Sequence, residues 1–168
     1  MDASTVTVRA ACALPFEEWA VRNIGIPTVR VGMRCKLGIP EGRIISVGVA
    51  GGLVPDLKIG SRIVSNRIVN EDGETLWEGA PLKVADAIVG TIVSARKIYD
   101  SHTSRKVLRE KTGAIAVETE SHMLAGPLFQ GSIHVISDTP RLPLICSVYG
   151  GIKALYELSK IRLQTELW

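Results

Sequence analysis

The sequence predicts a single α/β domain, because of its length, its aliphatic composition and a recurring pattern of short strands that end in glycine or carboxylate. At 168 residues the chain suits one ordinary domain and is too short for two comfortable ones. Hydrophobic residues make up 46% of it and aromatic residues only 5%, which is typical of a core built from valine, isoleucine and leucine. We therefore expect one hydrophobic core, in a protein that folds alone or as an oligomer.

Three apolar runs predict strands in the first third of the chain, over residues 6–14, 29–33 and 43–49. Pro15 ends the first run, and residues 16–23 follow as a brief helix. Glu17 is therefore expected at a loop edge behind the first strand. The third run is almost continuously apolar, which is typical of a strand that is buried on both faces.

A glycine-rich segment, Gly48-Val49-Ala50-Gly51-Gly52-Leu53, follows the third run. Its three glycines permit unusual dihedral angles and allow the backbone to approach a ligand closely. We expect this segment to be a loop at the carboxyl end of a strand. A glycine cluster alone is more often an ordinary turn than a ligand site. Its interpretation therefore depends on the motifs around it.

The rest of the chain alternates between expected strands and helices. Strands are expected over residues 59–69, 88–94, 114–117 and 133–136, and helices over residues 104–111 and 151–168. The last helix is amphipathic, because Ile152, Leu155 and Leu158 recur near helical spacing. Two of these strands lead into carboxylates, and ligands of open α/β sheets bind at the carboxyl ends of strands. The pattern therefore predicts a ligand site at these strand ends.

Charge and hydropathy exclude several classes of partner. The net charge of +3 comes from 20 basic and 17 acidic residues spread along the chain, without the basic run that tracks a nucleic-acid backbone. No apolar stretch approaches the roughly 20 residues that span a bilayer, and no signal peptide is indicated. We expect a cytoplasmic protein that binds no nucleic acid and does not insert stably into a membrane.

The cysteines and histidines show neither disulfide nor metal-ligand spacing. The cysteines are Cys12, Cys35 and Cys146, and the histidines are His102, His122 and His134. An odd number of distant cysteines is typical of reduced, buried thiols. Histidines without a ligand pattern are usually structural or surface residues. No metal and no cofactor are expected.

Acidic side chains follow three of the expected strands: Glu17, the pair Glu118 and Glu120, and Asp138. Breaking an N-glycosidic bond requires a proton donor for the departing base, acceptors for the ribose hydroxyls as the sugar gains oxocarbenium character, and a positioned nucleophile on the opposite face. Carboxyl groups can fill all three roles. The same residues also suit a solvated strand end, a helix cap or a turn.

The order of these motifs resembles the nucleoside phosphorylase/nucleosidase superfamily, including its purine nucleoside phosphorylase-like members. The matching segments are Ala11 to Leu14 with Glu17, the glycine-rich segment with Gly60 downstream, Gly113 to Ser121, and Ile136 to Asp138. Glu120-Ser121-His122, the turn Glu71-Asp72-Gly73 and residues 101–114 are most similar to the hopanoid-associated nucleosidase branch. The resemblance implies one three-layer αβα domain over residues 1–168, with a central mixed sheet.

The resemblance also implies a role for each matching residue. Asp138 corresponds to the acid that hydrogen-bonds or protonates N7 of the purine, and Glu120 to the carboxylate that accepts from the ribose hydroxyls. Glu17 corresponds to the carboxylate that orients the attacking water in hydrolytic members. The other residues expected to contact substrate are Glu118 and Thr119 on the ribose side and Ala50, Gly51 and Gly52 of the glycine-rich segment.

Departures from the family pattern favour hydrolysis. Members that use phosphate carry an Arg in the strand before the glycine segment and a Ser or Thr within it, where this chain has Ser46 and Val49. Without a cationic, donor-rich cradle a phosphate dianion is poorly stabilised, so water oriented by Glu17 is the favoured nucleophile. Thr119 replaces a family methionine, and His134 replaces a family arginine.

The expected activity is cleavage of the N-glycosidic bond of a purine, adenosine-type nucleoside by a homo-oligomer, with water favoured over phosphate. The spacings from Glu17 to the glycine segment and from Glu120 to Asp138 are shorter than in the family, and Gly126 and Pro127 shorten the helix that follows Glu120. This shortening leaves two alternatives. One is a catalytically impaired nucleoside-binding or protein-interaction module, and the other is a truncated gene product that is stable only as an oligomer.

Overall fold

The structure is a computed structural model that describes residues 7–142 and 148–163. Within these residues the strands are β1 (Val8–Cys12), β2 (Thr28–Arg30), β3 (Arg43–Gly52), β4 (Arg62–Val69), β5 (Thr75–Glu78), β6 (Ala87–Ser94), β7 (Ala116–Glu118) and β8 (Phe129–Asp138). The helices are α1 (Pro15–Val21), α2 (His102–Thr112), α3 (Ser121–Leu124) and α4 (Val148–Ser159), with a 3₁₀ turn over Met33–Cys35. The expected α/β class with a central mixed sheet is confirmed.

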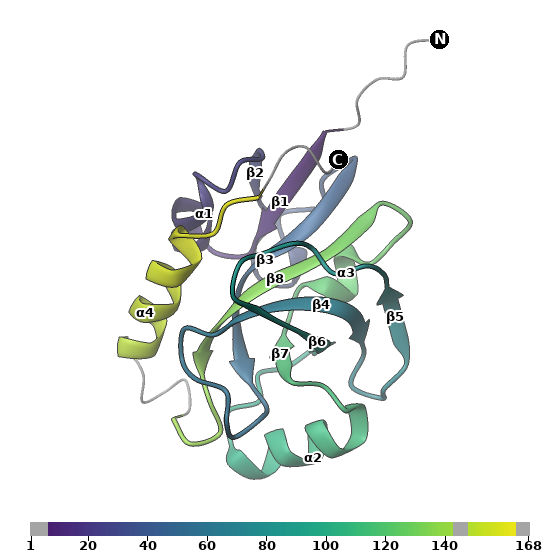
Figure 1. The fold of residues 1–168 in the computed structure, drawn as a ribbon. Helices are drawn as coiled ribbons and strands as arrows, with labels where there is room; N and C mark the ends of the chain where they lie inside the picture. Colours follow the sequence, from purple (N-terminus) through teal and green to yellow (C-terminus); the bar gives the residue numbers. More distant parts are fainter. Residues whose placement is uncertain (1–6, 143–147, 164–168) are drawn as a thin grey trace.

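Five strands of the sheet close into a ring. β3 pairs with β7, β7 with β6, β6 with β4, β4 with β8, and β8 again with β3. The pairs β3–β7 and β4–β8 are antiparallel and the other three are parallel. β1 and β2 extend the sheet beyond β3, and β5 extends it beyond β4, as Figure 1 shows. The ring brings the carboxyl ends of β3, β7 and β8 together.

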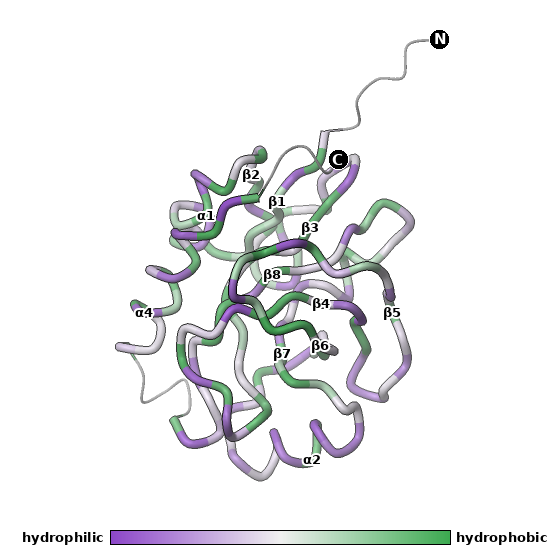
Figure 2. Tube along the Cα trace, viewed as in Figure 1, coloured by the Kyte–Doolittle hydropathy of each residue, from purple (hydrophilic) through white to green (hydrophobic). Residues whose placement is uncertain are grey.

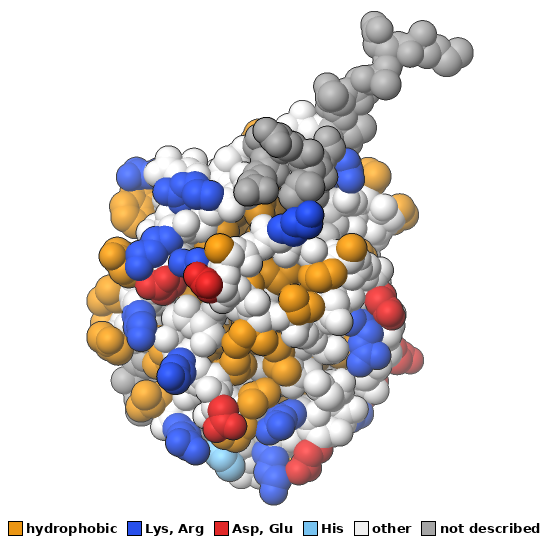
Figure 3. Space-filling view, viewed as in Figure 1, with side chains coloured by type: hydrophobic (Ala, Val, Ile, Leu, Met, Phe, Trp, Pro, Cys, Tyr) orange, Lys and Arg blue, Asp and Glu red, His pale blue; other side chains and the backbone are white. Residues whose placement is uncertain are grey.

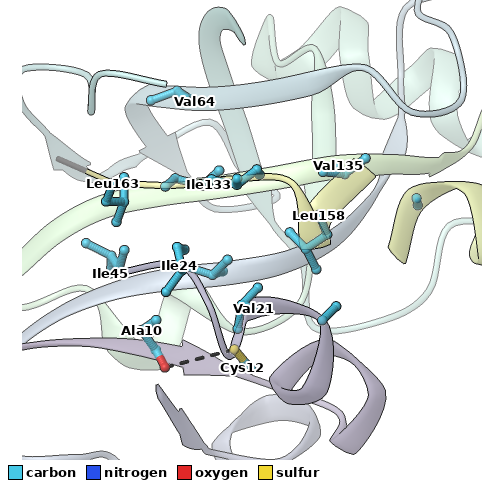
Figure 4. Close-up of a cluster of buried hydrophobic side chains, with 14 of the residues drawn as sticks. Ala10, Cys12, Val21, Ile24, Ile45, Val64, Ile133, Val135, Leu158 and Leu163 are labelled. Atoms are coloured by element: carbon cyan, nitrogen blue, oxygen red, sulfur yellow. Dashed lines mark hydrogen bonds between the residues drawn. The ribbon is translucent and has the colours of Figure 1, made fainter. Parts of the chain in front are cut away.

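The largest hydrophobic cluster lies between the sheet and two helices. Helices α1 and α4 pack against each other on one side of the sheet, and α4 also covers β8 (Figure 1). Figure 4 shows the side chains that fill this space, among them Ile45, Ile133 and Leu158. Figure 2 shows the contrast in hydropathy between the apolar strands β4 and β6 and the largely hydrophilic helix α2. The apolar runs of the sequence thus supply the core.

Three expectations about individual elements are corrected. The glycine-rich segment is no loop, because Gly48 to Gly52 continue β3 and pair with β8 and then with β7. The short strand β5 was not expected. The terminal amphipathic helix is α4, which begins earlier than expected and ends at Ser159. The expected helical residues 164–168 lie outside the described part of the chain.

Helix α2 is capped at both ends by local sequence signals. The Ser101 hydroxyl accepts a hydrogen bond from the backbone N–H of Ser104, and Gly113 adopts the left-handed conformation that ends many helices, with φ of 69°. Helix α3 has only four residues, in agreement with the shortening expected from Gly126 and Pro127.

No helix in the described ranges has the length and apolar character needed to cross a bilayer.

Candidate active site

A cavity of about 150 Å³ opens where β3, β7 and β8 end and where α1 begins. Its lining includes most of the site residues predicted from the sequence: Glu17, Ala50, Gly51, Glu118, Thr119, Glu120 and Asp138. Gly52 does not line it, although its neighbours do. The Gly52 carbonyl instead accepts a hydrogen bond from Arg105 at 3.3 Å. The fold therefore places the predicted residues around one space, with the single exception of Gly52.

Glu17 lies in the first turn of α1 and not at a loop edge. Its Oε2 accepts from the backbone N–H of Leu14 at 2.8 Å, and its Oε1 accepts from the backbone N–H of Val49 at 2.9 Å. The carboxyl is buried. Burial raises its pKa from the ordinary 4.5 to about 7, the two backbone N–H groups oppose the rise, and the charge of Glu120 adds to it.

Glycine in β3 leaves the space that the acidic side chains occupy. A Cβ atom at position 48 would lie 2.7 Å from Oε1 of Glu17. A Cβ atom at position 51 would lie 3.2 Å from both Arg105 Nη2 and Asp138 Oδ2. These glycines therefore permit close approach, as expected, but they do so from within a strand.

Asp138 ends β8 and forms a buried ion pair with Arg105 of helix α2. Its Oδ2 accepts a hydrogen bond from Nη2 of Arg105, and its Oδ1 accepts from the Ser137 hydroxyl at 2.7 Å. The Asp138 and Arg105 side chains are 4% and 2% exposed, so water screens this pair little. Both carboxylate oxygens of the candidate acid therefore already have partners in the protein.

Glu118, which ends β7, and Glu120, two residues later, are held mainly by backbone groups. Oε2 of Glu118 accepts from the backbone N–H groups of Glu120 and Ser121, at 2.8 and 2.9 Å. Burial raises the pKa of the Glu118 carboxyl, and the nearby charge of Glu120 adds to the rise. Oε1 of Glu120 accepts from the Thr119 hydroxyl at 2.6 Å and from the backbone N–H of Arg34 at 3.3 Å. Thr119 thus orients Glu120.

The turn that contacts Glu120 has an unusual backbone. Arg34 and Cys35 both have φ of 53°, in the left-handed region that non-glycine residues rarely adopt. The Cys35 thiol lies 3.8 Å from the Glu120 carbonyl oxygen, which it faces as a weak donor. Backbone strain of this kind persists where the surrounding structure holds it in place. This turn forms part of the cavity rim through Met33.

His134 lies next to Glu118 in the interior of the protein. Its Nε2 is 4.0 Å from Oε2 of Glu118, and both side chains are buried. Burial lowers the pKa of His134 to about 4, which favours the neutral imidazole at neutral pH. His134 therefore brings no fixed positive charge to Glu118.

Several cavity residues were missed by sequence reasoning, above all Arg105. The other missed residues with side chains at the cavity include Met33, Lys97, Ile98 and Tyr99. Arg105 shares the buried face of α2 with Leu108 and Thr112. An arginine at apolar spacing on an amphipathic helix was a usable signal, because a buried arginine requires an acidic or carbonyl partner.

Metal-binding and reactive-thiol sites are not prominent in the described ranges. Residues 7–142 and 148–163 contain no group of three or more His, Cys, Asp or Glu residues that is suited to a metal ion. Cys12 and Cys35 are free thiols in buried positions, and burial raises the pKa of both. Cys146 lies outside the described residues.

Comparisons with solved structures connect this fold to nucleosidases. No protein-family model and no curated protein matches the chain. The 5′-methylthioadenosine/S-adenosyl homocysteine nucleosidase of Helicobacter pylori has a TM-score of 0.68 and 16% identity, over 93% of this chain and 96% of that one. Futalosine hydrolase of the same organism has a TM-score of 0.68 and 15% identity, over 95% and 97%.

A third neighbour is the 5′-methylthioadenosine/S-adenosylhomocysteine nucleosidase of S. pneumoniae with a transition-state inhibitor. Its TM-score is 0.69 and its identity 12%, over 92% of this chain and 95% of that one. At such low identity the likeness concerns the fold. The chain therefore shares the fold of these nucleosidases, as the order of its motifs implied.

Proposed function

We propose that this protein is a nucleosidase that hydrolyses the N-glycosidic bond of a purine, adenosine-type nucleoside. The observation that carries the proposal is that Glu17 and Asp138 line the same cavity as the two glutamates at the end of β7, Glu118 and Glu120. The nucleosidase fold of the neighbours supports the same reaction class, and one H. pylori neighbour was solved with 5′-methylthioadenosine in its active site.

Glu17 is the proposed general base. Its pKa of about 7 places it where a base is most effective near neutral pH, because the carboxylate is present and the protonated form is also accessible. The backbone N–H groups of Leu14 and Val49 hold both of its oxygens in fixed positions. A water molecule next to Glu17 would give its proton to the carboxylate as its oxygen attacks the sugar.

Asp138 is the proposed partner of the purine, and Glu120 with Glu118 and Thr119 the proposed partners of the ribose. Asp138 and Glu120 belong to different strand ends that border the same cavity. Glu120 keeps lone pairs for ribose hydroxyls beside the bonds it accepts from Thr119 and Arg34. Hydrogen bonds from the hydroxyls to this carboxylate strengthen as the sugar becomes cationic.

Hydrolysis is favoured over phosphorolysis because the donors near the glycine segment are already engaged. The Val49 N–H donates to Glu17, and the Arg105 guanidinium donates to Asp138. Lys97, the other cationic residue of the described lining, lies over the Tyr99 ring at 5.1 Å. A phosphate dianion would have to compete for these groups.

A homo-oligomer in the cytoplasm remains part of the proposal. The cavity of about 150 Å³ is the size that holds one small ring, whereas ligand pockets commonly measure about 300–1,000 Å³. A second copy of the chain would enlarge the enclosed volume for the sugar and its 5′ substituent. Figure 3 shows hydrophobic and basic side chains side by side over α1 and α4, where Phe16, Trp19 and Ile152 are exposed.

The decisive experiment measures base release from a panel of 5′-modified adenosines, with and without phosphate. We expect release that does not depend on phosphate, and a loss of about a hundredfold or more in kcat/KM for Glu17→Gln and for Asp138→Asn. Arg109→Gln, on the exposed face of α2, serves as the control. Absence of base release under every condition would contradict the proposal, and a strict need for phosphate would identify a phosphorylase.

A nucleoside-binding module without catalysis is the second candidate. The engagement of both Asp138 oxygens by Arg105 and Ser137 favours it, because these contacts compete with a bond between Asp138 and the leaving base. Calorimetry with adenine and adenosine distinguishes the two functions. Binding without turnover, together with a loss of affinity in Asp138→Asn no larger than one hydrogen bond, would support the module.

A further inference from the structure

We propose that Arg105 is a positioning residue, which holds Asp138 so that Asp138 meets the purine as a hydrogen-bond acceptor. This inference rests on the proposed function, in which Asp138 contacts the base. Sequence motifs did not identify Arg105, and the motif resemblance assigns it no role. Its contacts in the structure carry the inference.

The Arg105 guanidinium uses its donors on three different parts of the fold. Nε donates to the Tyr99 carbonyl at 2.6 Å, Nη1 donates to the Gly52 carbonyl at 3.3 Å, and Nη2 donates to Oδ2 of Asp138. The first two bonds fix the plane of the guanidinium, because its five N–H groups form a rigid fork. The third bond then fixes the carboxylate of Asp138.

The pairing directs two donors at Asp138. Arg105 donates to Oδ2, and the Ser137 hydroxyl, whose other acceptor is the Ala50 carbonyl at 3.4 Å, donates to Oδ1 at 2.7 Å. Each carboxylate oxygen can accept a second hydrogen bond. These acceptor sites suit an atom of the base that carries a hydrogen, as a protonated N7 or an exocyclic amino group does. A bare N7 acceptor would face a carboxylate oxygen and be repelled.

This state of Asp138 defines where the protons go during hydrolysis. The C1′–N9 bond breaks and its electron pair leaves with the base, while the water oxygen bonds to C1′ and its proton passes to Glu17. The base takes a proton from solvent at N7, and Asp138 accepts a hydrogen bond from the new N7–H. Glu17 returns its proton to solvent afterwards. Arg105 favours the step by keeping the Asp138 charge next to this N–H.

The test uses two ring probes that differ in the group presented at position 7. In 9-deazaadenine N7 carries a hydrogen, whereas 7-deazaadenine has carbon there. We expect wild type to bind 9-deazaadenine more tightly, by about tenfold to a hundredfold, the range for a hydrogen bond to a charged group. Arg105→Gln should reduce this ratio to near unity, and Arg105→Lys should retain part of it, because lysine keeps the charge but loses the fork.

Controls separate this role from a structural one. Arg109→Gln, on the exposed side of the same helix, should leave the ratio unchanged. If Arg105→Gln does not fold, the double variant Arg105→Gln/Asp138→Asn, which carries no buried charge at the pair, provides the neutral reference, and it too should lack the preference. Circular dichroism and thermal unfolding verify folding. A structural role alone would lower the folded fraction without changing the ratio of the two affinities.

The outcomes distinguish this inference from the proposed function. If wild type releases base but a folded Arg105→Gln or the double variant keeps the probe ratio, the positioning role is overturned while the nucleosidase proposal stands. If wild type neither binds the probes nor releases base, the proposed function fails and this inference fails with it. A lost ratio in Arg105→Gln with partial retention in Arg105→Lys supports the inference.

Discussion

The two sides of the cavity hold the same kind of side chain in opposite electrostatic settings. On one side Glu17, Glu118 and Glu120 are bound mainly by backbone N–H groups and the Thr119 hydroxyl, and among the described residues no lysine or arginine forms an ion pair with them. On the other side Asp138 is paired with a buried guanidinium. The difference separates carboxyl groups held by partial charges, two of which have a raised pKa, from one that faces a full positive charge.

The physical cause lies in the strength of the compensating partner. Backbone N–H groups carry partial charges, and for Glu17 they only partly offset the loss of hydration on burial, so the pKa rises to about 7. The Arg105 guanidinium offers a full positive charge and donates to Asp138 through Nη2. A proton-accepting role therefore suits the glutamate side, and a charge-presenting role suits the aspartate side.

Removing the carboxylate of the ion pair should have the largest effect. Asp138→Ala leaves Arg105 buried without its counter-charge, and we expect the free energy of unfolding in urea to fall by about 3–5 kcal/mol. Glu120→Ala removes a carboxylate that has no cationic partner and should cost about 1 kcal/mol. Equal losses for the two variants would show that the two sides do not differ as described.

The pH dependence of stability should report the glutamate side. Because the Glu17 pKa is raised on folding, the folded protein binds this proton more tightly than the unfolded chain, so stability falls as pH rises from about 4.5 to about 7. The shift corresponds to about 3 kcal/mol of stability, which is fully present below the unfolded pKa and is lost as the pH rises through the folded pKa. Urea unfolding of Glu17→Gln across this window should show a flatter profile. An unchanged slope would contradict the assignment.

Crowding the glutamate side should produce a smaller effect on activity. In Gly48→Ala the added Cβ would lie 2.7 Å from Oε1 of Glu17, so the carboxyl must move. We expect kcat/KM for base release to fall by about tenfold to a hundredfold, the scale for a displacement of roughly 1 Å. Gly151→Ala, where a Cβ meets nothing within 4 Å, is the matched control. Similar activities in the two variants would argue against Glu17 as the base.

Relaxing the turn beside Glu120 should have the smallest effect. Arg34→Gly removes the steric penalty at φ of 53°, and we expect a gain of about 1 kcal/mol in the free energy of unfolding. The Arg34 N–H that reaches Glu120 is retained, so base release should change little. A loss of stability would show that the Arg34 side chain contributes more than its backbone strain removes.

The sequence predicted the strands with strong apolar runs and the residues that border the cavity. The runs that became β3 and β6 were visible because they are long and aliphatic, whereas only residues 133–136 of β8 were predicted as a strand. Strand β5 was not visible, since Thr75–Glu78 is short, lies at the end of the sheet and is only partly buried. The glycines of β3 favour a loop locally, but pairing to β8 and β7 overrides that preference.

Other features depend on contacts between distant residues. Ring closure requires β8 to pair with both β3 and β4, and no local pattern encodes that register. Arg105 and Asp138 are 33 positions apart, so their pairing follows from the placement of α2 against the ends of β3 and β8. The sequence could predict which strand ends carry acids, but not which acid would meet a cation.

The closed ring separates the parts of this protein that can diversify from those that cannot. Asp138 ends a strand that is paired on both sides, whereas Met33, Lys97 and Tyr99 reach the cavity from segments that belong to no strand. Exchanges in these rim segments can alter which ligands enter the cavity without disturbing the hydrogen-bonded frame. An engineer who wishes to change the ligand of this protein should therefore begin at the rim and leave β3 and β8 untouched.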